Sequence, residues 1–190
     1  MKIGFYGGTF DPVHRGHIKV AKELINLGYC DRIYLMPNKN SFGKNPASFE
    51  HRFNMCEAAT ERSKNIEVTN IESRFPDSVE TYNIVNEYIL PVYGGYNQIF
   101  FISGIDVAKQ IPEWKTGQKL IDSIPHIVVG TCNSWQEYWF ENEPHSIVNI
   151  PTPNIHSSAL RCDLNQKRCE YFLPYIPLSV LDYIFEQELY

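Results

Sequence analysis

The stretch Gly7-Gly8-Thr9-Phe10-Asp11-Pro12-Val13-His14-Arg15-Gly16-His17 joins the first apolar segment of the chain to its first helical pattern. The apolar segment, Lys2 to Tyr6, is short and aromatic, which is typical of a strand. Beyond the stretch, apolar residues recur at helical spacing and predict a helix over His17 to Leu27, ending at Gly28. A strand, a glycine-containing turn and a helix in this order predict the start of a βαβ unit.

The rest of the chain continues this alternation. Further strands are expected at Arg32 to Met36, Ile66 to Thr69, Gln98 to Ser103, His126 to Thr131 and Ser146 to Ile150. Further helices are expected from Ser48 to about Ser63, Val79 to Leu90, Ser157 to Asp163 and Leu178 to Glu188. This pattern predicts an α/β fold, a Rossmann-like doubly wound parallel sheet with helices on both faces and a small C-terminal helical part. No repeat or linker divides the chain, so residues 1–190 are expected to form a single domain.

The composition excludes several classes of protein. With 43% hydrophobic and 21% charged residues, the 190-residue chain has the make-up of an ordinary globular protein. A formal net charge of -5 argues against a dedicated nucleic-acid binder but is compatible with a polyphosphate ligand. Five scattered cysteines without a C-x-x-C pair argue against a disulfide framework or a zinc site. We expect a cytoplasmic protein with no membrane partner, because neither a signal peptide nor a long apolar run is present; a homo-oligomer is left open.

Two histidines, His14 and His17, stand three residues apart at the start of the first predicted helix. If that helix begins near Pro12 or Val13, both imidazoles lie on one face beside the positive end of the helix dipole, which suits a phosphate group. The turn has neither the G-x-G-x-x-G of a dinucleotide oxidoreductase nor a P-loop. Zinc would need a third ligand, for which Asp11 is the one candidate. A turn with two surface histidines is the plainer alternative to a phosphate site.

A second anion site is predicted in Ile155-His156-Ser157-Ser158-Ala159-Leu160-Arg161, near the end of the expected sheet. Ser157 or Ser158 can cap a helix and offer hydrogen-bond donors. Arg161 lies four residues after Ser157 and shares its helix face. Such a segment occurs by chance when it stands alone. Its combination with the first segment in one α/β chain is far more specific.

Both segments resemble the two signatures of the nucleotidyltransferase superfamily that carries an H-x-G-H motif. The longer GGTFDPVHRGH is most similar to the motif of the nicotinate or nicotinamide mononucleotide adenylyltransferases. Other segments share the resemblance: Ser48 to Met55, Val79-Glu80-Thr81, Gly104-Ile105-Asp106 with Trp114-Lys115, and the ending Pro177 to Tyr190. The chain departs from the usual family pattern at Val79, at His156 and Ser158, and at Thr131-Cys132-Asn133, where an arginine often lies near the phosphates.

The resemblance implies transfer of an adenylyl group from ATP to a pyridine mononucleotide, with Mg²⁺ bridging the phosphates of ATP and no metal ligand from the protein. It implies catalytic roles for His14, His17 and Arg161. ATP would be bound by Gly7, Gly8, Thr9, Phe10, His14, Gly16, His17, Gly104, Asp106, Ser157, Ser158 and Arg161. The mononucleotide would be bound by Lys44, Arg52, Glu80, Thr81 and Trp114. Trp114 could instead pack in the core, and Asp106 could simply cap the helix that follows it.

The chemistry of such a transfer needs no general base. The attacking phosphate monoester has a second pKa of about 6, so it is already largely ionised at pH 7. Catalysis then depends on positioning and on relief of charge repulsion. We assign His17 to the α-phosphate, His14 to the neighbouring phosphates and Arg161 to the β- and γ-phosphates. The alternatives are a phosphopantetheine adenylyltransferase, a cytidylyltransferase of the same superfamily, and a nucleotide sensor without activity.

Overall fold

A single parallel sheet forms the centre of the computed structural model, which describes residues 1–39, 46–76, 79–130, 138–153 and 155–190. Its strands are β1 (Lys2–Gly8), β2 (Arg32–Pro37), β3 (Ile66–Val68), β4 (Gln98–Gly104), β5 (His126–Val129) and β6 (Ser146–Val148). They lie in the order β3-β2-β1-β4-β5-β6, and each neighbouring pair is parallel. The strand order reverses between β1 and β4, so their carboxyl ends form the switch point at which ligands of such sheets bind.

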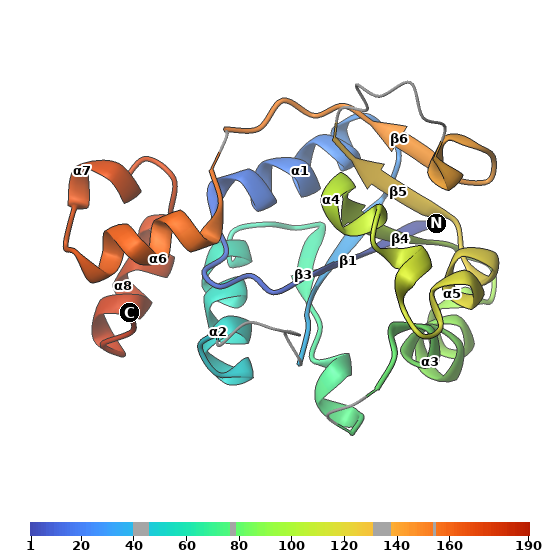
Figure 1. Ribbon diagram of the computed structural model, residues 1–190, viewed down its shortest axis with the longest axis horizontal. Helices are drawn as coiled ribbons and strands as arrows, with labels where there is room; N and C mark the ends of the chain where they lie inside the picture. The colour runs from blue at the N-terminus through green and yellow to red at the C-terminus, as the bar shows by residue number, and fades with distance from the viewer. Residues whose placement is uncertain (40–45, 77–78, 131–137, 154) are drawn as a thin grey trace.

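Helices cover both faces of this sheet (Figure 1). They are α1 (Arg15–Asn26), α2 (Phe49–Thr60), α3 (Thr81–Ile84), α4 (Ile105–Ala108), α5 (Gly117–Ser123), α6 (Ser157–Asn165), α7 (Cys169–Phe172) and α8 (Leu178–Glu186). A π-helix, η2 (Val85–Gly94), continues α3, and short 3₁₀ turns form η1 (Ile71–Arg74), η3 (Ile111–Glu113) and η4 (Trp139–Glu141). The predicted Rossmann-like fold is confirmed.

Side chains of β1 alternate between two hydrophobic cores, one on each face of the sheet. Ile3 and Phe5 belong to the core under η2 and α5. Tyr6 belongs to the other core, which α1, α2 and the C-terminal helices complete. A strand that is buried on both faces carries apolar residues at successive positions, which explains the nearly continuous apolar run of Lys2 to Tyr6.

The C-terminal helices form the predicted small helical part, which lies beside α1 and α2 at the left of Figure 1. Polar contacts join α8 to α2 in addition to the shared core. The hydroxyl of Tyr183 lies 3.0 Å from His51 Nδ1 and accepts a hydrogen bond from Asn54 Nδ2 at 2.9 Å. Ser179 donates to the carbonyl of Ala58 at 2.7 Å. These contacts bring the last helix of the chain next to the segment that follows β2.

Two predicted helix starts are wrong by a few residues. The first helix begins at Arg15, two residues before the predicted His17 and after the start near Pro12 or Val13 that was considered for the histidine pair, because Phe10 has a left-handed backbone (φ 51°) and His14 is extended. The third begins at Thr81 rather than Val79, because Glu80 is extended at its N-cap. The sequence Asp77-Ser78-Val79-Glu80 has the spacing of a capping box, but Asp77 and Ser78 lie outside the described ranges.

Ser48 is the N-cap of α2, at the predicted start of that helix, and its hydroxyl accepts a hydrogen bond from the backbone of His51 at 3.2 Å. The short helix α5 is not predicted by the sequence, because its seven residues are too few for a clear helical period. Within the described residues, no helix combines the length and the apolar character that a membrane crossing requires.

Candidate active site

The first turn of α1 is closed by its two histidines. His14 is the N-cap, and its Nδ1 accepts a hydrogen bond from the backbone of Gly16 at 3.1 Å. His17 Nδ1 accepts in return from the backbone of His14 at 3.2 Å. Because Nδ1 is an acceptor in both rings, each neutral imidazole carries its proton on Nε2. The capping box therefore leaves Nε2–H as the donor that each ring can offer a ligand.

Burial keeps both rings neutral at physiological pH. The imidazoles stack with their centroids 3.7 Å apart, and the edge of His17 packs against Phe10. Burial, together with nearby His156, lowers the pKa of His14 to about 4. Burial and the adjacent His14 hold the pKa of His17 well below its usual value. The pair therefore presents two neutral, oriented N–H groups at a helix N-terminus, rather than two cations.

The glycine of the H-x-G-H motif is required by close packing of the first histidine. A Cβ at Gly16 would lie 2.9 Å from Cε1 and Nδ1 of His14, which is too close for any larger residue. Gly8 has a similar constraint, because a Cβ there would lie 2.9 Å from the ring of Phe10. The predicted ATP residues Gly7, Gly8, Thr9 and Phe10 thus form a tightly packed path from β1 to α1.

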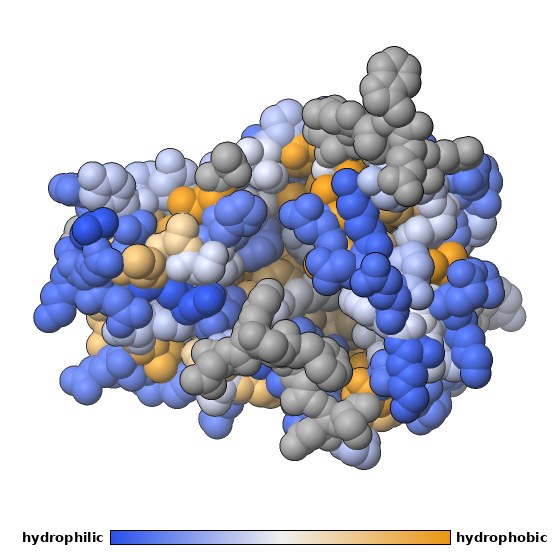
Figure 2. Space-filling view, in the orientation of Figure 1, coloured by the Kyte–Doolittle hydropathy of each residue, from blue (hydrophilic) through white to orange (hydrophobic). Residues whose placement is uncertain are grey.

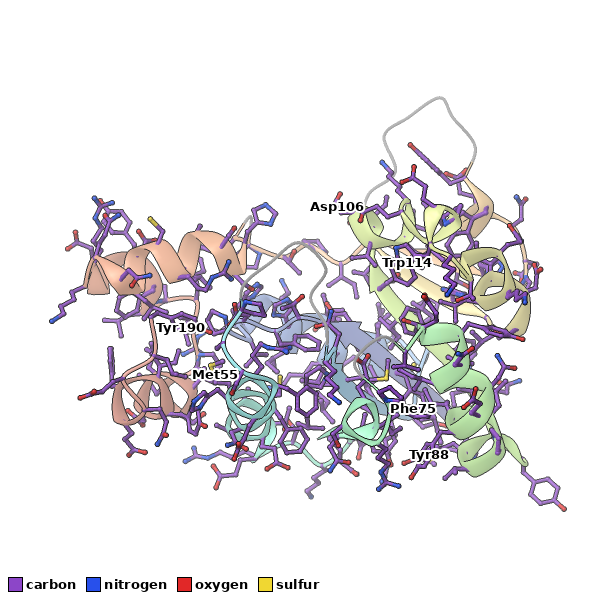
Figure 3. All side chains as sticks on the ribbon, turned by 60° about the horizontal axis from the view of Figure 1, so that its bottom comes forward. Met55, Phe75, Tyr88, Asp106, Trp114 and Tyr190 are labelled. Carbon is purple, nitrogen blue, oxygen red and sulfur yellow. The ribbon has the colours of Figure 1, made fainter. Side chains whose placement is uncertain are left out.

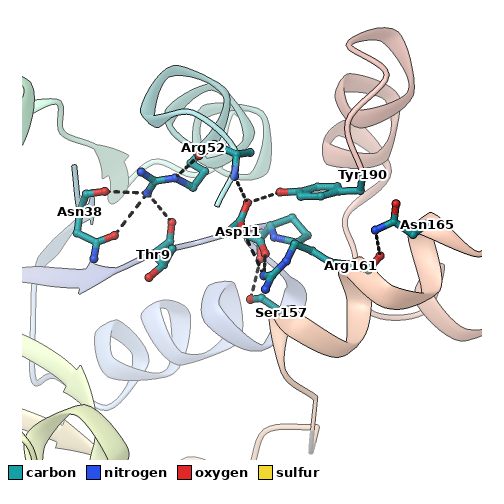
Figure 4. A network of polar contacts seen from close by, with 10 residues as sticks. Thr9, Asp11, Asn38, Arg52, Ser157, Arg161, Asn165 and Tyr190 are labelled. Atoms are coloured by element: carbon teal, nitrogen blue, oxygen red, sulfur yellow. Dashed lines mark hydrogen bonds and ion pairs between the residues drawn. The ribbon is translucent and has the colours of Figure 1, made fainter. Parts of the chain in front are cut away.

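The second predicted segment packs directly on the first (Figure 4). Ser157 donates its hydroxyl proton to the carbonyl of Pro12 at 3.1 Å, and Arg161 Nη1 donates to the carbonyl of Asp11. The same nitrogen lies 3.3 Å from Asp11 Oδ2. The N-cap of α6 is His156, so the expectation that Ser157 or Ser158 caps this helix is wrong. The Ser157 hydroxyl is occupied by Pro12 instead, and Ser158 is exposed.

Asp11 lies at the centre of this junction, a place that the sequence did not reveal. Its side chain is buried, with 2% of the residue exposed. Arg161 faces one oxygen of the carboxylate, Oδ2. The other oxygen, Oδ1, accepts hydrogen bonds from the backbone of Ala47 at 3.2 Å and from the hydroxyl of Tyr190. One feature of the sequence could have pointed to this role: Asp11 lies between two apolar residues, Phe10 and Pro12. A carboxylate in an apolar environment needs hydrogen-bonding or charged partners.

Arg52 is fully buried and holds backbone together (Figure 4). Its Nη1 donates to the carbonyls of Thr9 at 2.9 Å and Asn38 at 2.8 Å, and its Nε donates to that of Ala47 at 2.9 Å. These bonds tie the turn after β1 to both sides of the segment that follows β2. Contact of Arg52 with a substrate stays a prediction, and Lys44 lies outside the described residues.

The remaining predicted residues lie on elements beyond β3 and β4. Gly104 is the N-cap of α4 and Asp106 is in its first turn, while Glu80 is the N-cap of α3 and Thr81 its first residue. Trp114 ends η3 and packs against the core under η2. In Figure 3, Asp106 and Trp114 lie across the molecule from Tyr190. None of these five makes a hydrogen bond or ion pair with His14, His17 or Arg161 within the described part of the chain. Their roles toward a ligand stay predictions.

Figure 2 shows one face of the molecule depressed in its middle, between the C-terminal helices and the α4–α5 region. The turn after β1 and the N-terminus of α6 meet at the carboxyl edge of the sheet, where Ser157 is bonded to Pro12. No three His, Cys, Asp or Glu side chains of the described residues are grouped as a metal site, so a zinc site built on His14 and His17 has no support.

Comparison with known proteins agrees with this arrangement. The model of the cytidylyltransferase-like family matches residues 5–163. A protein of Carboxydothermus hydrogenoformans named probable nicotinate-nucleotide adenylyltransferase is 30% identical over 203 residues, with 100% of this chain and 98% of the relative covered. A protein of the same name from Bacillus licheniformis is 30% identical over 192 residues, with the same coverage.

Solved structures show the same fold. The nicotinic acid mononucleotide adenylyltransferase of Plasmodium falciparum, complexed with NaAD, has a TM-score of 0.76 and 24% identity, with 99% of this chain and 96% of that chain covered. The same enzyme complexed with APC has a TM-score of 0.75 at 24% identity and equal coverage. From the family match and the relatives of 30% identity, the chain belongs to the cytidylyltransferase-like family, in the group of the nicotinate-nucleotide adenylyltransferases.

Proposed function

We propose that this protein transfers the adenylyl group of ATP to nicotinate mononucleotide, or to its nicotinamide form, and releases pyrophosphate. One observation carries the proposal: Ser157 and Arg161 of α6 are bonded to Pro12 and Asp11, in the turn that leads from β1, at the switch point of the sheet, to the histidine pair. Relatives over the whole chain are named for this activity, which supports the choice of nucleotide and acceptor.

In the proposed reaction, a phosphate oxygen of the mononucleotide attacks the α-phosphorus of ATP. A new phosphorus–oxygen bond forms, the bond from the α-phosphorus to the bridging oxygen breaks, and pyrophosphate leaves with that oxygen. The nucleophile is already ionised at pH 7, so no side chain has to remove a proton. The protein contributes alignment and electrostatic stabilisation of the charge that develops in the transition state.

The Nε2–H group of His17 is proposed to donate to the α-phosphate, and that of His14 to the adjoining phosphates. Neutral donors suit this task because they add no charge that would hold the product pyrophosphate strongly. Arg161 supplies the positive charge, through guanidinium bonds to the β- and γ-phosphates. Ser157 and Ser158 are proposed to contribute backbone donors from the first turn of α6.

On the acceptor side, we propose that Lys44 binds the phosphate of the mononucleotide and that Glu80, Thr81 and Trp114 lie along its pyridine ring. Arg52 supports this side by fixing the backbone at Thr9 after β1, at Asn38 after β2 and at Ala47 before α2. We also propose that Gly104 and Asp106 contact the ATP sugar and base.

Magnesium would be held by the substrate more than by the protein. Within the described residues no cluster of three possible ligands is present, and the carboxylate of Asp11 is already bonded to Arg161, Ala47 and Tyr190. This donor set fits a Mg²⁺ ion that would enter with ATP and take few ligands from the protein. Bound in that way, Mg²⁺ would neutralise part of the triphosphate charge.

We further propose that residues 1–190 form a single domain that acts in the cytoplasm on small nucleotides. The net charge of -5 supports small nucleotides over nucleic acid as partners. Light scattering coupled to size exclusion would measure whether the protein is a homo-oligomer.

Coupled detection of pyrophosphate tests the proposed function. The purified protein is incubated with ATP or CTP and with nicotinate mononucleotide, nicotinamide mononucleotide, phosphopantetheine or a phosphorylated alcohol. We expect pyrophosphate with ATP and a pyridine mononucleotide, and a dinucleotide of matching mass in the same mixture. Release with CTP alone or with phosphopantetheine would replace the proposal by another transfer, and tight ATP binding without any release would replace it by a nucleotide sensor.

A further inference from the structure

The carboxylate of Asp11 joins three distant parts of the chain at the phosphate side of the site. Ala47 is 36 residues away in the sequence, Arg161 is 150 and Tyr190 is 179. The two oxygens of the carboxylate have different partners. Oδ1 accepts from Ala47 and Tyr190, and Oδ2 faces Arg161. Figure 4 shows Tyr190 and Arg161 reaching Asp11 from different directions.

We propose that Asp11 and Tyr190 are positioning residues for Arg161: the phenol fixes the carboxylate, and the carboxylate fixes the guanidinium that receives the β- and γ-phosphates of ATP. This inference rests on the proposed function, because it deepens the role assigned to Arg161.

Burial of the Asp11 carboxylate limits the orientations that it can adopt. A carboxylate that is 2% exposed needs each of its oxygens paired, since an unpaired buried charge is strongly unfavourable. The two donors on Oδ1 prevent the carboxylate from turning away, so Oδ2 stays directed at Arg161. Without the hydroxyl of Tyr190, Oδ1 would keep only the bond from Ala47, and Oδ2 would be held less firmly toward Arg161.

The geometry of Arg161 is suited to a ligand. All of its guanidinium contacts within the described residues go through Nη1, which leaves Nη2 and Nε with no protein partner there. Its side chain is 30% exposed, so these two groups are accessible to a triphosphate. An arginine whose first nitrogen is fixed presents its other donors in one orientation, which favours a bidentate phosphate contact.

Tyr183 offers a matched control for Tyr190. Both are tyrosines of the C-terminal part whose hydroxyls make hydrogen bonds to other elements, but Tyr183 contacts His51 and Asn54 of α2 instead of Asp11. Replacing either residue by phenylalanine keeps the ring and removes the hydroxyl. A general structural role predicts similar effects of the two substitutions, whereas the positioning role predicts different ones.

The experiment compares wild type, Tyr190→Phe, Tyr183→Phe, Arg161→Ala and the double variant Tyr190→Phe/Arg161→Ala. For each, pyrophosphate release gives kcat and the KM of both substrates, calorimetry gives the affinity for ATP, and thermal unfolding checks the fold. We expect Tyr190→Phe to lower kcat/KM for ATP by about tenfold and to leave the KM for the mononucleotide within about twofold of wild type. Tyr183→Phe should leave all kinetic constants within about twofold.

The double variant decides whether Tyr190 acts through Arg161. If it does, Tyr190→Phe should have no further effect on ATP affinity once Arg161 is alanine, because coupled residues are not additive. Equal kinetics of Tyr190→Phe and Tyr183→Phe, or a full additional loss in the double variant, would overturn the inference. A wild-type protein that releases no pyrophosphate would overturn the proposed function alone, since the ATP affinities measured by calorimetry still test the positioning of Arg161.

Discussion

At the scale of single residues, the unusual feature is a pair of histidines that serve as donors without carrying charge. Their Nδ1 atoms are used by backbone amides of the first turn of α1, and burial lowers the pKa of both rings. In the proposed mechanism the site separates two tasks. Arg161 would provide the permanent positive charge, and the neutral histidines would provide directed N–H groups.

His17→Ala tests this separation of tasks. The substitution removes the donor proposed for the α-phosphate, where charge develops in the transition state, so kcat should fall by at least about a hundredfold. The KM for ATP should change much less, because Arg161 and α6 remain. The measurement is steady-state pyrophosphate release, with circular dichroism to confirm the fold. His51→Ala, which removes a histidine bonded to Tyr183 away from the site, is the control. Turnover of the His17 variant within about threefold of wild type would contradict the assignment.

Sequence patterns identified the motif residues of the candidate site, but not the residues that hold those motifs in place. The spacing of His14, Gly16 and His17 and the late Arg161 could be recognised because each motif is local. The role of Asp11 could not, since its partners are up to 179 residues away and a single carboxylate has no pattern. Arg52 shows a second limit: residue type suggested a substrate contact, whereas its guanidinium is bonded to backbone carbonyls. Alternation of strands and helices predicted the sheet, because each face of each strand must be covered.

At the scale of elements, short connections set the positions of the helices around the sheet. Between β4 and β5 the chain forms α4, η3 and α5 within a few residues of one another, and η3 packs on the first turn of α5. Gly117 allows that contact, because a Cβ on it would lie 1.7 Å from the carbonyl oxygen of Ile111. This connection carries Asp106 and Trp114, so its geometry also sets the far wall of the proposed ligand site.

Gly117→Ala should therefore destabilise the protein strongly. The overlap is with backbone and cannot be relieved by rotating a side chain, so we expect a loss near the upper end of overpacking, about 3 kcal/mol. For a chain of this size that corresponds to a fall in Tm of roughly 6 to 12 °C. Gly94→Ala is the matched control, because a Cβ there meets nothing within 4 Å and the Tm should hardly move. Equal melting temperatures for the two variants would show that the backbone at Ile111 adjusts without strain.

At the scale of the whole molecule, burial of imidazoles links stability to acidity. His126 at the start of β5 is fully buried among Phe101, Trp139 and His145, and its Nδ1 has no hydrogen-bond partner within the described residues. Burial lowers its pKa to about 4, as it does for His14. In the unfolded chain a histidine has a pKa of about 6.5. Between these values the unfolded state binds more protons, so stability is present above pH 6.5 and is lost as the pH falls toward 4.

His126→Gln isolates one of these contributions. With a pKa of about 4 for His126 in the folded state, the free energy of unfolding of the wild type should fall by about 2 kcal/mol more than that of the variant between pH 7 and pH 5. Urea unfolding at pH 7 and pH 5 measures the free energy of unfolding of both proteins. Comparing the change with pH in each protein cancels any stability that the substitution itself removes at pH 7. Parallel pH dependence of the two proteins would mean that His126 becomes protonated in the folded state without penalty.

The bond between Tyr190 and Asp11 also has a consequence for synthesis of the protein. A growing chain can pair β1 with β2 and form the histidine cap of α1 soon after these segments leave the ribosome, because N-terminal parts fold first. The arginine side of the site is different, since translation must reach Tyr190, 179 residues after Asp11, before the carboxylate has all its partners. Nascent chains would thus carry a formed half-site for phosphate while remaining unable to orient Arg161, and competence to handle ATP would arise only after synthesis has passed α8 and reached Tyr190.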